Sequence, residues 1–232
     1  MNSNQRPVYY GHRNLTFGTV NQQPMAQSIP LFPLRTVLYP GGPLPLRIFE
    51  TRYLDMISRC LKTESPFGVL LIKNGAETGP ADTYELGTLA RIQDWYQGSD
   101  GLLGVTAIGE QRFRLLSAER QKDGLNVGEI ELLDLDEPAE LPADCRNMAQ
   151  ILAGVLGNLG KLYDDLDTQY EDAGWVAYRF AEILPVSVES KQRYLEIDDP
   201  LVRLREIETV LREIGSEQSR KSSSRPEDSE RD

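Results

Sequence analysis

The chain has 232 residues, and its 36 acidic against 25 basic side chains give a formal net charge of −11. No apolar run of about 18 residues occurs, which excludes a transmembrane helix, and the polar N-terminus lacks the pattern of a signal peptide. The acidic excess argues against binding of a phosphate backbone. We therefore expect a cytoplasmic protein with no membrane or nucleic-acid partner.

The two ends of the chain differ in composition from its middle. Residues 1–28 are rich in Asn and Gln, and residues 216–232 form a charged, Ser-rich run without apolar side chains, so both are predicted to be disordered tails. Within the body, 126–172 holds twelve acidic and two basic residues, a net charge of −10. Most of the excess charge is therefore concentrated in one stretch.

Residues 29–141 consist of short apolar runs broken by Gly and Pro, which predicts a β-rich domain. One helix is expected over Thr51–Lys62, with Thr51 as its N-cap and Leu54, Ile57 and Leu61 on its apolar face. Because proline cannot donate to a ladder, the first two strands should be edges or bend sharply. Strands are predicted at 29–34, 36–39, 67–72, 85–95, 102–108, 111–120 and 125–135, with turns at 109–110 and 123–124.

Residues 142–215 have a helical period and are predicted to form a second domain, a helical bundle. Apolar positions from Met148 to Leu162 and from Trp175 to Leu184 mark two helices, and a short third helix covers 187–195. A fourth helix follows the pair Asp199-Pro200, an N-cap with proline at the first helical position. The expected fold class is α+β: a small twisted sheet or barrel with one early helix, followed by the helical bundle.

No set of residues with catalytic spacing is found. The single histidine, His12, lies in the predicted N-terminal tail, and Cys60 and Cys145 are expected to be buried, reduced thiols, too few for a zinc site. The glycines at 154, 157 and 160 are expected to permit close helix packing or a kink, because no strand precedes them as in a nucleotide fold. The acidic run 164–167 lacks the glycine turn of a calcium loop.

Two Ser/Lys pairs have the spacing of neighbours on a helix, Ser58/Lys62 and Ser187/Lys191. A lysine general base must be desolvated, whereas both pairs are predicted to face solvent on amphipathic helices. We therefore predict no catalytic residue, no metal and no cofactor.

The segment from Ile29 to Tyr53, IPLFPLRTVLYPGGPLPLRIFETRY, resembles the opening of the substrate-binding domain of Lon proteases. Similar blocks follow in the same order at 67–72, 85–92, 100–102 and 109–114. The resemblance implies a PUA-like β-barrel joined to a helical bundle, a barrel that also occurs in cereblon-type proteins. It further implies recognition of unfolded or tagged polypeptides and contacts within a homo-oligomer. Because no ATPase or Ser-Lys protease domain accompanies it here, the expected function is non-catalytic: an adaptor or a regulator of proteolysis.

A groove between barrel and bundle, lined by aromatic side chains, is the expected polypeptide-binding site, since aromatic residues supply anchoring area. The pair Trp95-Tyr96 is the leading candidate within it. The full candidate set is Phe32, Tyr39, Tyr53, Trp95 and Tyr96.

Four charged residues of the matching blocks are expected to form ion pairs that stabilise the fold rather than bind a ligand. They are Arg47, Glu50, Arg52 and Arg112.

Two other functions remain open from the sequence. The first is a small-ligand-binding or hydrolytic protein that uses carboxylates in the PUA-like cavity, which would require a closed pocket with converging acids. The second is RNA binding through Arg112, Arg114 and Arg120, which the acidic body disfavours. The acidic stretch 126–172 is instead expected to attract basic segments of a polypeptide.

Overall fold

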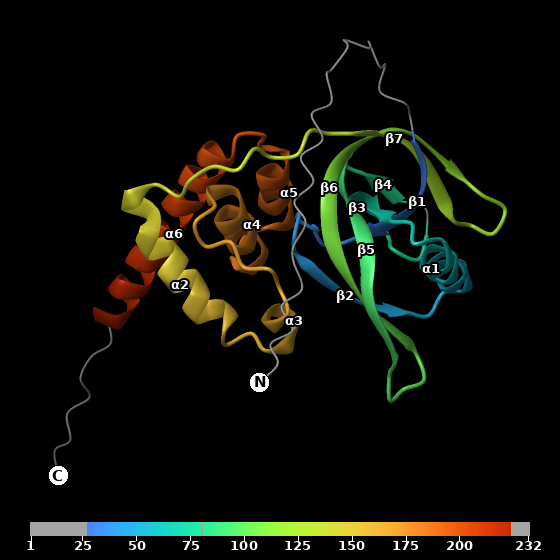
Figure 1. The fold of residues 1–232 in the computed structure, drawn as a ribbon, viewed down its shortest axis with the longest axis horizontal. Coiled ribbons are helices and arrows are strands. Elements are labelled where there is room, and N and C mark those ends of the chain that lie inside the picture. Colours follow the sequence, from blue (N-terminus) through green and yellow to red (C-terminus); the bar gives the residue numbers. More distant parts are fainter. Residues whose placement is uncertain (1–26, 80, 224–232) are drawn as a thin grey trace, which may run out of the picture.

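The computed structural model describes residues 27–79 and 81–223, with side chains up to residue 216. His12 and most of both predicted tails lie outside the described residues. A sheet half (27–132) and a helical half (143–223) lie next to each other and are joined by a connector, residues 133–142 (Figure 1). None of the helices in the described part of the chain is both long and apolar enough to cross a bilayer.

The sheet half is a mixed sheet of seven strands, and its first strand pairs with two others. The strand order is β1-β7-β6-β5-β3-β4, β2 pairs with β6, and β1 also pairs in parallel with β3. The only helix of this half, α1 (Thr51–Thr63), lies on the side away from the helical half (Figure 1). The strands are β1 (Gln27–Leu34), β2 (Pro43–Ile48), β3 (Phe67–Gly75), β4 (Ala81–Thr83), β5 (Leu86–Gln97), β6 (Leu103–Arg120) and β7 (Asn126–Leu132).

The proline-rich start of the sheet differs from the prediction. The segment 36–39 is not a strand. The second strand is instead β2, which was not predicted, and it is an edge that pairs with β6 alone. Strand β1 is not an edge, but its pairings are staggered: Pro30 pairs only with β7 and Pro33 only with β3. Each proline therefore lies where the strand has a single neighbour, which is how a missing amide proton is tolerated.

The predicted turn at 109–110 is absent, because β6 runs unbroken through it. Gly109 has a different role: a Cβ there would overlap the carbonyl of Tyr39. The amide of Gly41 donates to the Gly109 carbonyl over 2.7 Å, and the Gly109 amide donates to Gly42 over 2.9 Å. Glycine at 109 therefore allows the loop before β2 to lie directly on β6.

Helix α1 follows Glu50 rather than beginning after a cap at Thr51, and of the predicted apolar face it buries only Ile57. Leu54 and Leu61 are more than a third exposed, whereas Tyr53 and Met56 are buried. Two apolar stripes share Ile57 on this helix, and the one that also carries Tyr53 and Met56 is buried.

Six helical segments follow the connector, and the first long one is shorter than predicted. It ends at Leu156 rather than continuing to Leu162, and Gly160, with φ +79°, precedes the next helix. A Cβ on Gly154 would meet nothing within 4 Å, so this glycine serves no close packing. The segments are η1 (Ala143–Cys145), α2 (Arg146–Leu156), α3 (Lys161–Asp164), α4 (Ala173–Ile183), α5 (Val188–Glu196) and α6 (Pro200–Ser223).

The last helix, α6, begins at the predicted cap but ends later than predicted. Asp199 accepts from the amides of Leu201 and Val202 at the start of α6, as the predicted N-cap requires. At its other end α6 continues to Ser223, beyond the boundary expected at residue 215.

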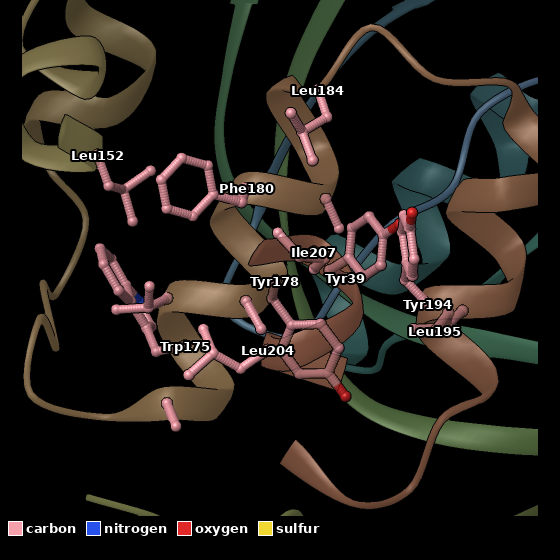
Figure 2. Close-up of a cluster of buried hydrophobic side chains, with 14 of the residues drawn as sticks. Tyr39, Leu152, Trp175, Tyr178, Phe180, Leu184, Tyr194, Leu195, Leu204 and Ile207 are labelled. Carbon is pink, nitrogen blue, oxygen red and sulfur yellow. The ribbon is translucent and has the colours of Figure 1, made fainter. Parts of the chain in front are cut away.

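The helical half shares its core with the sheet half. Tyr39, from the loop before β2, is fully buried among α4, α5 and α6, and Figure 2 shows it beside Tyr194. Its ring lies 5.4 Å from that of Tyr178, and its hydroxyl donates to the carbonyl of Lys191 over 2.7 Å. The two halves are therefore packed against each other as one body rather than only tethered by the connector.

Candidate functional site

A groove of about 400 Å³ lies at the junction of the two halves. It is lined by the loop at Pro40 and Gly41, residues 110–112 of β6, connector residues 134–138 and the first turns of α4. A second hollow lies on the other side of the same connector residues, toward the start of α6. We call the first hollow the junction groove.

The carboxylate of Asp136 ties the connector to both halves. One oxygen accepts from Arg112 on β6 over 3.0 Å, and the other accepts from Arg203 on α6 over 2.8 Å. Arg112 also donates to the carbonyl of Leu195, and Arg203 donates to the carbonyl of Tyr194. Both arginines are buried. Because buried charges require close partners, these contacts hold the connector in place beside the groove.

Two aromatic residues of α4, Trp175 and Tyr178, form the apolar lining. The guanidinium of Arg203 stacks on the ring of Tyr178 at 3.9 Å, and that of Arg179 lies 5.7 Å from the Trp175 ring. Burial raises the pKa of the Tyr178 hydroxyl, and the neighbouring carboxylate of Asp136 raises it further. The hydroxyl therefore lies against the residue that ties the connector to both halves.

The start of α4 and the connector form the outer walls. Asp172 caps α4 by accepting from the amide of Trp175 over 2.7 Å, and it also accepts from Ala139 over 3.0 Å. Leu135 is 71% exposed, although it is a large apolar side chain. An apolar side chain displayed at the mouth of a groove is typical of a binding surface.

A buried charged cluster formed by α4 and α5 contacts the loop at Pro40, which lines the groove. Glu182 accepts from Arg179 over 2.7 Å, and Arg179 also donates to the carbonyl of Pro40 over 2.9 Å. Lys191 donates to the backbone carbonyl of Glu182 over 2.7 Å. Burial raises the pKa of Glu182 to about 7, despite the opposing effect of Arg179 and Lys191. Burial likewise lowers the pKa of Lys191. The cluster fastens the loop at Pro40 to the helices.

Three of the five predicted aromatic residues are core residues. Phe32 stacks on Tyr53 with ring centroids 4.0 Å apart, inside the sheet half. Tyr39 is in the shared core described above. None of the three lines the junction groove. The structure therefore does not bring the predicted set together into one surface.

Trp95 and Tyr96 lie near the end of the β5–β6 hairpin and are 59% and 48% exposed. Adjacent residues of a strand face opposite sides of it, so the two rings cannot form one continuous patch. The ring of Tyr96 lies over Gly104 on β6, where a Cβ would overlap it. These residues are exposed aromatics on a hairpin, apart from the residues that line the groove.

The four charged residues predicted to pair do form ion pairs, in three separate places. Arg47 pairs with Asp100 at the hairpin loop, with both side chains about half exposed. Arg52 pairs with Glu50 at 2.9 Å and donates to the carbonyl of Gly124, which joins α1 to the turn before β7.

Arg112 is the third, in the junction described above. It is buried there, so it cannot share a phosphate-binding face with the exposed Arg114, its neighbour on β6.

Neither Ser/Lys pair forms a dyad. Ser187 is the N-cap of α5 and accepts from the amide of Ser190. Lys191 is partly buried rather than facing solvent, but it bonds Glu182 instead of Ser187. Ser58 and Lys62 are exposed, as predicted. Among the described residues no cluster of three His, Cys, Asp or Glu side chains could hold a metal ion.

The sequence predicts a groove at this junction but not the residues that line it. Its pattern places Trp175 and Tyr178 on the apolar face of a helix and Leu135 at the end of a strand. Acidic residues on both sides of Leu135, followed by Pro138, are the available signal that the strand ends earlier.

Comparison with known proteins agrees with this architecture. Residues 28–213 match the family model of the ATP-dependent protease La (LON) substrate-binding domain. Lon protease 2 of Myxococcus xanthus is 26% identical over 202 residues, which are 84% of this chain and 24% of that protein. Cereblon of Gallus gallus is 29% identical over 119 residues, 50% of this chain and 26% of cereblon. The chain thus spans about a quarter of the length of these curated relatives.

Solved structures give the same result. A Lon N-terminal domain protein from Xanthomonas campestris has 36% identity and a TM-score of 0.66, covering 79% of this chain and 98% of its own. The N-terminal domain of the Lon protease of Mycobacterium avium complex shares the fold, with a TM-score of 0.52 at 16% identity. The family model, which covers most of the chain, shows that this protein belongs to the LON substrate-binding domain family.

Proposed function

We propose that the protein is a non-catalytic polypeptide-binding module, an adaptor or a regulator of proteolysis, which binds clients in the junction groove. In this proposal the sheet is the PUA-like barrel of the family and the helical half its bundle. The family is one of substrate-binding domains, which supports a protein client. The observation that carries the proposal is an open groove with exposed Leu135 at its mouth and buried Trp175 and Tyr178 within.

The arrangement of carboxylates favours binding over hydrolysis. Asp136 pairs with two arginines and Asp172 caps a helix, so these two carboxylates of the lining are already engaged. Glu182, whose pKa is raised to about 7, is held against Arg179 and does not line the groove. A general acid or base must be able to reach the substrate, and Glu182 is not placed to do so in the groove.

The exposed pair on the β5–β6 hairpin offers a second contact in the same function. Trp95 and Tyr96 are each about half exposed, and the hairpin loop is braced by Arg47 and Asp100. Aromatic side chains on a braced hairpin lose little conformational entropy when they bind. We propose that they contact parts of a client that extend beyond the groove.

The proposal is tested by fluorescence anisotropy with a labelled polypeptide that is kept unfolded by reduction and carbamidomethylation, and with the same protein in its folded form. We expect binding of the unfolded form alone. Leu135→Ser should weaken binding, whereas Leu116→Ser, which removes a leucine that is also more than half exposed but lies on β6 outside the groove, should not. Equal binding by both variants would contradict the assignment of the groove.

A further inference from the structure

We infer that the junction groove selects a polypeptide segment that carries a lysine or arginine side chain and binds it alongside the connector. This deepens the polypeptide-binding function proposed above and rests on it. Three features of the groove carry the inference: free backbone groups, unpaired carboxylates and apolar side chains that can cover the stem of a basic residue.

The connector offers backbone groups for pairing. Its residues 134–137 have no regular structure, and none of their amides or carbonyls takes part in a hydrogen bond within the described residues. The chain is anchored on both sides, because Leu133 donates to the carbonyl of Arg112 and the carbonyl of Ala139 accepts from Ala173. Because this segment is anchored on both sides and its amides and carbonyls are free, an incoming polypeptide can form main-chain hydrogen bonds with it.

The charges of the groove favour a cationic occupant. Asp134 and Glu137 are exposed and form no ion pair within the described residues. The one basic side chain in the lining, Arg112, is buried and already bonded to Asp136, Asp198 and the Leu195 carbonyl. A basic side chain therefore finds two unpaired carboxylates, whereas an acidic one would be repelled and would find no free arginine.

The interior of the groove suits the rest of such a segment. Leu135 at the mouth and Trp175 inside can cover the apolar stem of a lysine or arginine, which commonly packs on apolar surface while its charge stays in water.

The test compares three labelled peptides of equal length that differ at one central position: lysine, glutamine or glutamate. At low salt we expect the lysine peptide to bind about five- to tenfold more tightly than the glutamine peptide, since two partly exposed ion pairs contribute on this scale. The glutamate peptide should bind most weakly. Added salt should reduce the difference between the three.

Two double variants with the same change in charge locate the effect. Asp134→Asn with Glu137→Gln should abolish the preference for lysine, so that the lysine and glutamine peptides bind with the same affinity. Asp55→Asn with Glu129→Gln removes two exposed carboxylates from α1 and β7, which do not line the groove, and should keep the preference. All four positions are exposed, so urea unfolding should show that both variants remain folded.

The peptide test distinguishes a failure of the selection for a basic side chain from a failure of polypeptide binding itself. If the three peptides bind equally, or the preference survives in the Asp134/Glu137 variant, the selection of a basic side chain is wrong and polypeptide binding stands. If none of the peptides binds and the unfolded polypeptide does not bind either, both proposals are wrong.

Discussion

The carboxylate of Glu182 occupies the space in which residue 42 would carry a side chain: a Cβ built on Gly42 overlaps its Oε1 atom. The loop before β2 and helix α4 can therefore lie this close because residue 42 has no side chain. The buried carboxylate of Glu182 fills the space. This contact packs the loop before β2 against α4, next to Gly41, which lines the junction groove.

Gly42→Ala should destabilise the protein by about 1–3 kcal/mol, because the added methyl group displaces a buried, hydrogen-bonded carboxylate. Urea unfolding measures the change. Gly154→Ala is the matched control: nothing lies within 4 Å of its Cβ position and it is helical, so it should stabilise by about 0.5–1 kcal/mol. If both variants lose stability, the chain does not tolerate replacement of glycine by alanine in general, and the loss in Gly42→Ala cannot be assigned to the contact with Glu182.

The pH dependence of stability should report on Glu182. Burial raises its pKa to about 7 in the folded state, against 4.5 for the group in water, so the folded protein holds this proton more tightly than the unfolded chain. The free energy of unfolding should therefore fall as the pH rises from about 4.5 to 7 and level off above, by up to about 3 kcal/mol from this group.

Glu182→Gln removes the titration, and its unfolding free energy should vary less over the same pH range than that of the wild type. Chemical denaturation at several pH values measures both curves. Parallel curves for the two proteins would show that Glu182 ionises normally.

Asp136→Ala should destabilise the protein by about 3–5 kcal/mol, since it leaves Arg112 and Arg203 buried without their shared counter-charge. Asp100→Asn breaks the ion pair with Arg47 at the exposed hairpin loop and should change stability little. Thermal unfolding of both variants checks the contrast, and equal losses would contradict the bridging role of Asp136.

Trp95→Ala should leave stability nearly unchanged while weakening the binding of an unfolded polypeptide, because the side chain is 59% exposed. Phe32→Ala, which removes an aromatic ring from the core of the sheet half, should cost about 3–5 kcal/mol instead. Calorimetry and anisotropy on the same samples separate the two effects. Unchanged binding by Trp95→Ala would exclude the hairpin from the client surface.

The sequence predicted elements best where one local pattern dominates. The apolar run of β3 and the cap of α6 at Asp199 were both identified. Prediction was wrong where two interpretations competed. Gly109 was interpreted as a turn but accommodates the neighbouring loop, and the stripe through Leu54 was preferred to the one through Tyr53 on α1. In each case the outcome depended on a partner that lies elsewhere in the chain.

The sequence by itself determined the family, through blocks that resemble it in the same order. It also determined the change from strand to helix period and the concentration of negative charge near the connector, because these two follow from local composition and spacing. Only the tertiary structure decided which aromatic residues are buried and which line the groove. The bonds that settle this join residues distant in sequence: Tyr39 bonds Lys191 across 152 positions, and Arg112 bonds Leu195 across 83. No local pattern carries such pairings, since they arise when the two halves pack together.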